Sequence, residues 1–117
     1  ENVLVMSFIG KNGVPAPKLS DIRELNAKNA KKIYDAVLKD MERLAKARLV
    51  HADLSAYNIL LLRKPYLIDF SQAVNSIHPL VKEFLLRDVK NVNRYFERFI
   101  EVVDEKKIFE RLLSLLS

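Results

Sequence analysis

The stretch "LVHADLSAYNILLLRKPYLIDF", residues 49–70, sets polar side chains against short apolar runs and decides how the chain is interpreted. Its segments "ILLL" and "YLI" predict two short strands joined by a hairpin, because a charged pair and a proline separate them. The polar residues around these strands are His51, Asp53, Asn58 and Asp69. Either they are polar groups satisfied inside an ordinary core, or they meet at a phosphate and a metal ion.

The hairpin register determines which of these side chains face each other. If Leu62 pairs with Pro65 across a two-residue turn, Asn58 lies opposite Asp69. Opposite residues on paired strands have Cβ atoms about 4.5–5.5 Å apart, so two of their oxygens could share one Mg²⁺, whose oxygen ligands lie at about 2.0–2.1 Å. A shift of one residue would break this pairing, and the proline leaves the register open by about one residue.

The spacing of Asp53 and Asn58 carries chemical information. Asn58 follows Asp53 by five positions, as in the H-R-D-x-x-x-x-N catalytic loop of kinases. Phosphoryl transfer explains the spacing, because a carboxylate must accept a hydroxyl proton at the reacting phosphate while the asparagine holds the metal from the far side. Asp69 would then take the place of the D-F-G aspartate. Each residue alone could instead cap a turn, but the ordered set around a hairpin favours phosphoryl transfer.

The composition limits the class of protein. A chain of 117 residues, 50% hydrophobic and 30% charged, fits one globular domain or part of a larger one. It has no cysteine, which fits a reducing cytoplasm, and no apolar run as long as a membrane span. Gly10 and Gly13 are its only glycines, so a glycine-rich phosphate loop is absent from this chain.

The remaining segments predict an α+β fold that is mostly helical. Residues 2–9 predict a short buried strand followed by a loop. A long helix is predicted over 26–48, where apolar residues keep the three-and-four spacing of one buried stripe. Further helices are predicted over 79–117, with Asp104 as the cap of the last. The basic face of the long helix is either solvated or faces RNA, and a net charge of +5 leaves both open.

Four segments together resemble the RIO family of atypical serine/threonine kinases, and its Rio-one branch most. These segments are "VLVMSFIG…GVPAPKL", "LVHADLSAYNILL", "YLIDFSQAV" and "HPLVKEFLLRDVKNVNRYF". The resemblance implies that 1–117 is the carboxy-terminal lobe of a protein-kinase-like fold with a central β-hairpin. Residues 1–19 would hold the end of the last amino-lobe strand, the hinge and a loop, and 49–70 the catalytic loop and metal-binding hairpin. The amino-terminal lobe would lie before Glu1.

The resemblance also assigns roles to individual residues. Asp53 is the catalytic aspartate, Asn58 and Asp69 hold the metal, and Asp69 also accepts phosphate as an acyl phosphate. The implied cofactors are ATP and Mg²⁺, with Mn²⁺ as the alternative. The expected nucleotide-binding residues are Met6, Ser7, Phe8, Ile9, Ser55, Tyr57, Asn58, Leu60 and Ile68. For the hinge side chains among them, packing without ligand contact is the open alternative.

Two further residues are expected to support the site, and two depart from ordinary kinases. His51 and Asp88 are expected to hold the loop rather than to react. Ala52 replaces the arginine that pairs with a phosphorylated activation loop, and Ser71 replaces the glycine of D-F-G. No A-P-E motif follows. These departures agree with RIO proteins and weaken the expectation of phosphorylation of other protein chains.

The function implied is ATP-dependent phosphoryl transfer, as a kinase, an ATPase or an autophosphorylating enzyme, in cytoplasmic maturation of the small ribosomal subunit. The implied partners are ATP, the amino-terminal lobe, the pre-small-ribosomal-subunit particle and rRNA, with no membrane. An exposed cleft face around Met6, Leu60 and Ile68 leaves a homodimer open. One alternative is a nucleotide-switched ribosome-assembly factor. Another is a small-molecule phosphotransferase of the aminoglycoside kinase type, against which the D-L-S-x-Y-N form argues.

Overall fold

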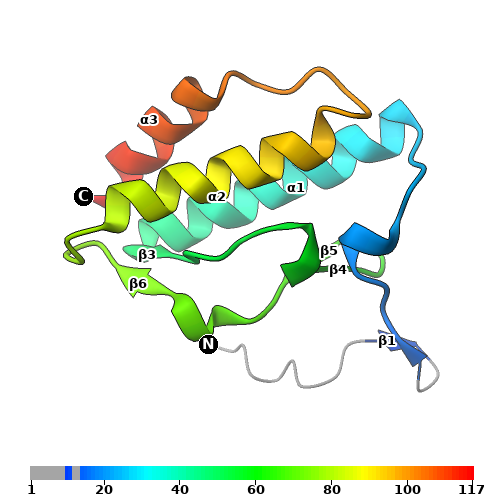
Figure 1. The fold of residues 1–117 in the computed structure, drawn as a ribbon, viewed down its shortest axis with the longest axis horizontal. Helices are drawn as coiled ribbons and strands as arrows, with labels where there is room; N and C mark the ends of the chain where they lie inside the picture. Colours follow the sequence, from blue (N-terminus) through cyan, green and yellow to red (C-terminus); the bar gives the residue numbers. More distant parts are fainter. Residues whose placement is uncertain (1–9, 12–13) are drawn as a thin grey trace.

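The computed structural model describes residues 10–11 and 14–117 of the chain (Figure 1). Three helices dominate this part, namely α1 (Ala27–Lys46), α2 (Val81–Phe96) and α3 (Glu105–Leu116). Antiparallel pairs are formed by β1 (Gly10–Lys11) with β2 (Val14–Pro15), β3 (Leu49–Val50) with β6 (Val74–Asn75), and β4 (Ile59–Leu61) with β5 (Pro65–Leu67). In Figure 1 the helices gather on one side and the strand pairs and loops on the other. The mostly helical fold with a central hairpin is therefore confirmed.

Helix α1 forms because its sequence supplies a cap and one apolar stripe. The Asn26 side chain accepts a hydrogen bond from the backbone N–H of Asn29 at 2.8 Å. The buried side chains of the stripe are Ala30, Ile33, Tyr34, Val37, Met41 and Ala45. The helix lies within the predicted range 26–48 and ends at Lys46, because Arg48 takes a left-handed conformation with φ 64°. Burying a side chain as large as Val, Leu or Phe stabilises the fold by about 1.5–3 kcal/mol each.

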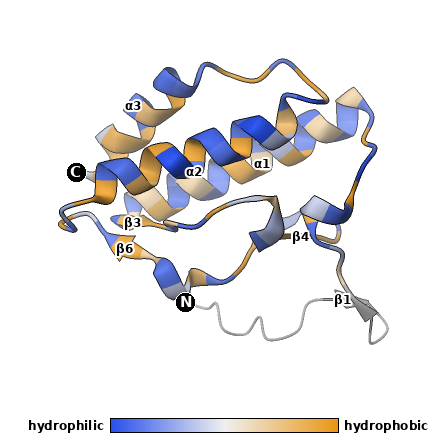
Figure 2. Ribbon diagram, viewed as in Figure 1, coloured by the Kyte–Doolittle hydropathy of each residue, from blue (hydrophilic) through white to orange (hydrophobic). Residues whose placement is uncertain are grey.

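Helices α2 and α3 complete the core. Helix α3 packs against both α1 and α2, and each helix turns an apolar stripe inward while its outer face is polar (Figure 2). Asp104 caps α3, as predicted, by accepting a hydrogen bond from the N–H of Lys107 at 3.2 Å. None of the helices in the described part is long and apolar enough to cross a bilayer.

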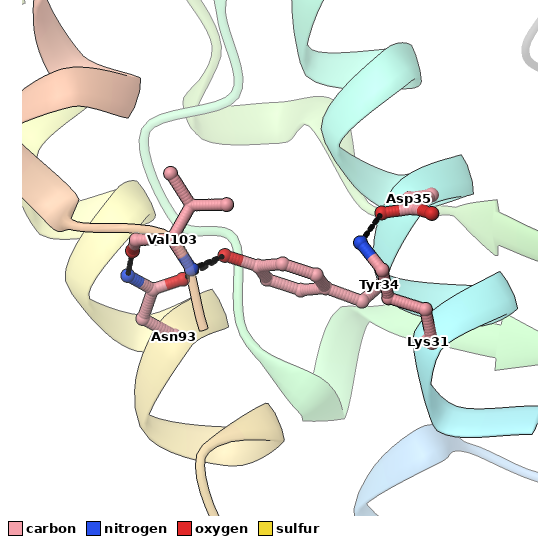
Figure 3. Close-up of polar contacts among 5 residues, drawn as sticks. All are labelled: Lys31, Tyr34, Asp35, Asn93 and Val103. Atoms are coloured by element: carbon pink, nitrogen blue, oxygen red, sulfur yellow. Dashed lines mark hydrogen bonds and ion pairs between the residues drawn. The ribbon is translucent and has the colours of Figure 1, made fainter. Parts of the chain in front are cut away.

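A buried polar contact joins α1, α2 and the connection between α2 and α3 (Figure 3). The Tyr34 hydroxyl donates to Asn93 Oδ1 at 2.7 Å and accepts from the N–H of Val103 at 3.1 Å. Asn93 Nδ2 donates in turn to the carbonyl of Val103 at 2.9 Å. Burial raises the pKa of Tyr34, so the hydroxyl keeps the proton that it donates. The α2–α3 connection is thereby fixed to the middle of α1.

The predicted register of the hairpin is wrong by one residue. Leu61 faces Pro65 and Leu60 faces Tyr66, so the turn holds three residues, 62–64. The reason is the missing N–H of Pro65, because a two-residue turn closed by Leu62 and Pro65 needs that donor. As a result Asn58 lies opposite Ile68, whose N–H donates to the Asn58 carbonyl at 2.9 Å. Asp69 is therefore not the cross-strand partner of Asn58.

Candidate functional site

The loop 51–58 is held by one buried side chain of α2. Asp88 is 1% exposed, and its carboxylate accepts hydrogen bonds from the N–H of Ala52 at 2.8 Å and of Leu54 at 3.0 Å. These donors stand on either side of Asp53 in the sequence. Burial raises the pKa of Asp88, and the two N–H groups oppose that shift because they favour the charged form. The position of Asp53 is thus set by α2.

Two neighbours of Asp88 on the same helix complete this support. Arg87 donates to the carbonyl of Ala52 at 2.6 Å, and Asn91 Nδ2 donates to the carbonyl of Leu54 at 3.1 Å. Both N–H and both carbonyl groups flanking Asp53 are therefore bonded to α2. The sequence analysis singled out Asp88 but missed Arg87 and Asn91. Their signal was the "RDVKN" run, in which positions 87, 88 and 91 lie on one face of a helix.

His51 connects the loop to the end of the hairpin. Its ring is 2% exposed, with Nε2 at 2.7 Å from the carbonyl of Ile68. Nδ1 accepts a hydrogen bond from the N–H of Asp53 at 3.2 Å, which assigns the ring proton to Nε2. The ring also packs on Phe70, with centroids 4.7 Å apart. His51 therefore joins the backbone of Asp53 to the strand that leads into Asp69.

Asn58 is oriented by the same loop. Its Nδ2 donates to the carbonyl of Asp53 at 2.7 Å. Because the amide nitrogen is used in this bond, the side-chain oxygen Oδ1 points away from that carbonyl and is available to a cation. An amide oxygen is a ligand of the type that Mg²⁺ accepts.

Asp69 stands at the other side of the site in an unusual backbone conformation. It has φ 60° and ψ 69°, is exposed, and accepts a hydrogen bond from Ser71 Oγ at 2.9 Å. Ala52, next to Asp53, also has a positive φ, 72°. Such conformations cost about 1–3 kcal/mol outside glycine and concentrate at functional sites. Ser71 thus binds the Asp69 carboxylate at the position where D-F-G carries glycine.

The predicted cation site uses few protein ligands. The described residues contain no group of three or more His, Cys, Asp or Glu side chains placed to hold a metal. One amide and one carboxylate, from Asn58 and Asp69, remain. This number fits Mg²⁺, which usually binds one or two carboxylates and takes its other ligands from water and substrate phosphates.

The remaining predicted residues lie in different surroundings. Ser55 Oγ accepts from the N–H of Tyr57 at 3.2 Å and so caps the short turn Ala56–Asn58, while Tyr57 is 68% exposed. Leu60 and Ile68 are half-buried on the hairpin. The hinge predictions fall outside the described residues, and these are Met6, Ser7, Phe8 and Ile9.

Comparison with known proteins identifies relatives of the chain. The family model described as "RIO domain" matches residues 1–108. The RIO-type serine/threonine-protein kinase Rio1 of Thermoplasma acidophilum is 46% identical over 110 residues, which cover 94% of this chain and 56% of that protein. The serine/threonine-protein kinase RIO1 of Homo sapiens is 45% identical over 112 residues, which cover 93% of this chain and 20% of that protein. The chain thus spans about half or less of these relatives.

A solved structure agrees with these matches. The Rio2 kinase from Chaetomium thermophilum, in its ADP/Mg²⁺-phosphoaspartate complex, superposes with a TM-score of 0.69 at 26% sequence identity. The superposition covers 88% of this chain and 38% of the Rio2 chain. Together with the family match over 1–108, this shows that the chain belongs to the RIO family, whose protein-kinase-like fold it shares.

Proposed function

We propose that this chain supplies the catalytic and metal-holding half of a RIO-type serine/threonine kinase that transfers the γ-phosphoryl group of ATP. The observation that carries the proposal is the bonding of Asp53, whose flanking backbone groups are all held by α2. A catalytic group must be kept in its productive position, because small displacements cost much of the rate. An exposed carboxylate on so firmly held a loop is suited to accept the proton of an attacking hydroxyl.

Asn58 and Asp69 are proposed to hold Mg²⁺, with Mn²⁺ as the alternative. Asn58 Oδ1 is left available because Nδ2 is bound to the Asp53 carbonyl, and the Asp69 carboxylate is exposed. When bound, the cation neutralises charge on the phosphates. The Asn58 side chain is also bonded to the loop that carries Asp53. The same loop therefore sets the positions of a proposed metal ligand and of the proposed catalytic carboxylate.

Asp69 is further proposed as a phosphate acceptor. The Rio2 neighbour was solved with ADP, Mg²⁺ and phosphoaspartate. In this chain Ser71 Oγ binds Oδ1 of Asp69, which leaves Oδ2 to attack the γ-phosphorus. The new bond joins Oδ2 to phosphorus, the bond to the bridging oxygen breaks, and ADP leaves with the electron pair. Water then hydrolyses the acyl phosphate, which restores the carboxylate and releases phosphate.

The biological setting is proposed to be maturation of the small ribosomal subunit in the cytoplasm. The support is the resemblance of "DLSAYN" and "DFSQAV" to the Rio-one branch. The pre-small-ribosomal-subunit particle, its rRNA and an amino-terminal lobe would be the partners.

A nucleotide-switched assembly factor is the second candidate, and one observation favours it. The segment between Asp69 and α2 folds back, because its strand β6 pairs with β3. Only 70–80 connect these elements, so little chain is left there to dock a substrate peptide. ATP hydrolysis through Asp69 would then change conformation rather than modify another protein.

A chimera tests the proposal. The 117 residues replace the matched 110 residues of Thermoplasma Rio1, and radiolabelled ATP reports ADP release and phosphate on protein or on small alcohols. We expect Asp53→Asn to lower turnover by about 10²–10⁴-fold, the usual contribution of a general base. The matched control is Asp35→Asn, a surface carboxylate paired with Lys31, which should leave turnover unchanged. Full turnover in the Asp53 variant, or label on a small alcohol, would overturn the proposal.

A further inference from the structure

A concave site opens beside the loop 51–58. This cleft of about 450 Å³ is lined by Ser20, Ser55, Tyr57, Arg94, Tyr95 and Arg98, among others. Its walls come from three segments: the turn Leu19–Asp21, the turn Ala56–Asn58 and the end of α2 with the residues that follow it. The two turns contact each other, and the Tyr95 hydroxyl donates to the carbonyl of Ile22 at 3.2 Å. The cleft is therefore built by contacts between distant parts of the chain. We call it the Arg94–Arg98 cleft.

The cleft concentrates positive charge. Arg94 lies in the last turn of α2, and Arg98 follows two residues after the helix ends at Phe96; both side chains line the cleft. Among the described residues neither forms an ion pair with a carboxylate, whereas Arg43 and Arg111 do. The Arg98 guanidinium lies over the rings of Tyr95, at 4.9 Å, and Phe99, at 5.0 Å. This stacking holds its plane, and a guanidinium presents paired donors that match an oxyanion.

Two hydroxyl groups on the opposite walls add donors. Ser20 Oγ is buried and has no hydrogen-bond partner among the described residues. Ser55 Oγ accepts from the N–H of Tyr57, so its own proton is free to be donated. Buried polar groups in proteins nearly always have a partner. These groups supply the kind of donors that a ligand with several acceptor oxygens needs.

We infer that the Arg94–Arg98 cleft binds an acidic or phosphorylated side chain of the polypeptide that accepts phosphate. This inference rests on the proposed function, because it places the acceptor near Asp53. Ser55 is two residues from Asp53, and two residues span at most about 7 Å. An anionic residue a few positions from the acceptor hydroxyl would therefore reach the cleft. An anionic residue bound in the cleft would hold the substrate peptide, for which the short segment 70–80 leaves little docking surface.

The chemistry of the cleft favours a peptide over a nucleic acid. Two guanidinium groups and two hydroxyls in a small cleft satisfy one phosphate or a pair of carboxylates. A single-stranded nucleic acid instead needs a basic groove that follows about 4–16 nucleotides. One exposed aromatic ring, that of Tyr57, stands at this site.

The test is an NMR titration of the 117-residue chain with a serine peptide in three forms: unmodified, phosphoserine and glutamate-substituted. Inorganic phosphate and an oligouridylate serve as further probes. We expect saturable shifts at the cleft residues with the phosphoserine and glutamate peptides, and at least tenfold weaker binding of the unmodified one. Arg94→Gln with Arg98→Gln should weaken binding at least tenfold. The matched control Arg63→Gln, which removes an exposed arginine from the hairpin turn, should weaken it less than twofold.

Folding and identity controls keep the result interpretable. Arg98→Gln could loosen the stacking on Tyr95, so Arg94→Gln alone, which removes a side chain with no bonded partner in the described part, is measured as well. Equal weakening by Arg63→Gln, shifts spread over the whole basic surface, or binding of phosphate alone as tight as that of the phosphopeptide would overturn the inference. Tighter binding of the oligouridylate in the cleft would also overturn it, in favour of nucleic acid.

The same sample separates this inference from the proposed function. Mn²⁺ should broaden resonances near Asn58 and Asp69, and Asp69→Asn should abolish the broadening. If phosphopeptide binds in the cleft while Mn²⁺ leaves Asp69 unaffected, the binding site stands and its assignment to a kinase acceptor fails. If Mn²⁺ binds at Asp69 and no peptide binds in the cleft, the inference alone fails.

Discussion

Replacing Asp88 with alanine should destabilise the folded chain. Asp88 is 1% exposed and accepts from the N–H groups of Ala52 and Leu54 at 2.8 and 3.0 Å. Hydrogen bonds to a charged group contribute about 1.5–3 kcal/mol each, so losing both has a ceiling of about 6 kcal/mol. Removing the carboxylate also removes its own desolvation penalty, which offsets part of this loss. We expect Asp88→Ala to lower the free energy of unfolding by about 2–4 kcal/mol.

Urea unfolding followed by circular dichroism measures this change, with the slope m as a check on two-state behaviour. Asp35→Ala is the matched control, because Asp35 is exposed and pairs only with Lys31. Such a surface pair contributes about 0.2–0.5 kcal/mol. Equal effects of the two alanine variants would show that the loop 51–58 does not depend on α2.

The pH dependence of the unfolding free energy tests the role of Asp88 independently. Burial raises the pKa of Asp88 above its ordinary value of 3.8. The folded chain then binds this proton more tightly than the unfolded chain, so the contribution is complete below about pH 3.8 and is lost as the pH rises through the folded pKa. Subtracting the unfolding free energy of Asp88→Asn from that of the wild type isolates this group. The difference should decrease as the pH rises from about 3.8, and an increase would refute the burial argument.

Three other predictions concern the stability of α1 and its contacts, and the binding of MgATP. Arg48→Gly should raise the free energy of unfolding by about 1 kcal/mol, because φ 64° suits glycine, whereas Lys46→Gly inside α1 should lower it by a similar amount; equal signs in urea unfolding would contradict this. Tyr34→Phe should lower the melting temperature by an amount equivalent to about 1–3 kcal/mol, because it leaves Asn93 and Val103 without their buried partner; an unchanged melting temperature would count against the role of this contact. Calorimetry should find no micromolar MgATP affinity for the 117-residue chain, because it contains only two glycines and no glycine-rich loop; micromolar binding would show that this half of the site suffices.

The helices could be predicted because their signals are local. The Asn26 cap, the apolar stripe of α1 and the Asp104 cap each lie within a few residues of what they stabilise. The spacing of Asp53 and Asn58 is local in the same sense, and the structure joins them through a hydrogen bond across five residues. Such local patterns can be recognised in a single sequence without any knowledge of tertiary contacts.

The hairpin register failed for a reason that was present in the sequence but weighed too lightly. Pro65 could not close a two-residue turn, because it has no N–H. The three-residue turn moves Pro65 opposite Leu61, whose own N–H donates to the carbonyl of Pro17 instead. That contact joins residues more than forty positions apart. The alternation of residues along the hairpin does not indicate this contact with Pro17.

The Arg94–Arg98 cleft could not be predicted for the same physical reason. It depends on the turn Leu19–Asp21 packing against the turn Ala56–Asn58, and nothing in the local sequence of either turn indicates the other. Arg94 and Arg98 by themselves predict only a charged helix face. In the folded chain Ser20 and Ser55 line the same cleft as the two arginines, which makes the arginines part of a candidate binding site.

Helix α2 contacts two different parts of the chain through two different sets of residues. Arg87, Asp88 and Asn91 bond the loop that presents Asp53, while Asn93 is bonded to Tyr34 of α1 and to the connection before α3. Asn93 follows Asp88 by five positions, which is about 7.5 Å along a helix that rises about 1.5 Å per residue. Helix α2 therefore connects Tyr34 of α1 to the loop that carries Asp53. The buried polar contact at Tyr34 thus helps to position the loop 51–58 as well as to stabilise the core.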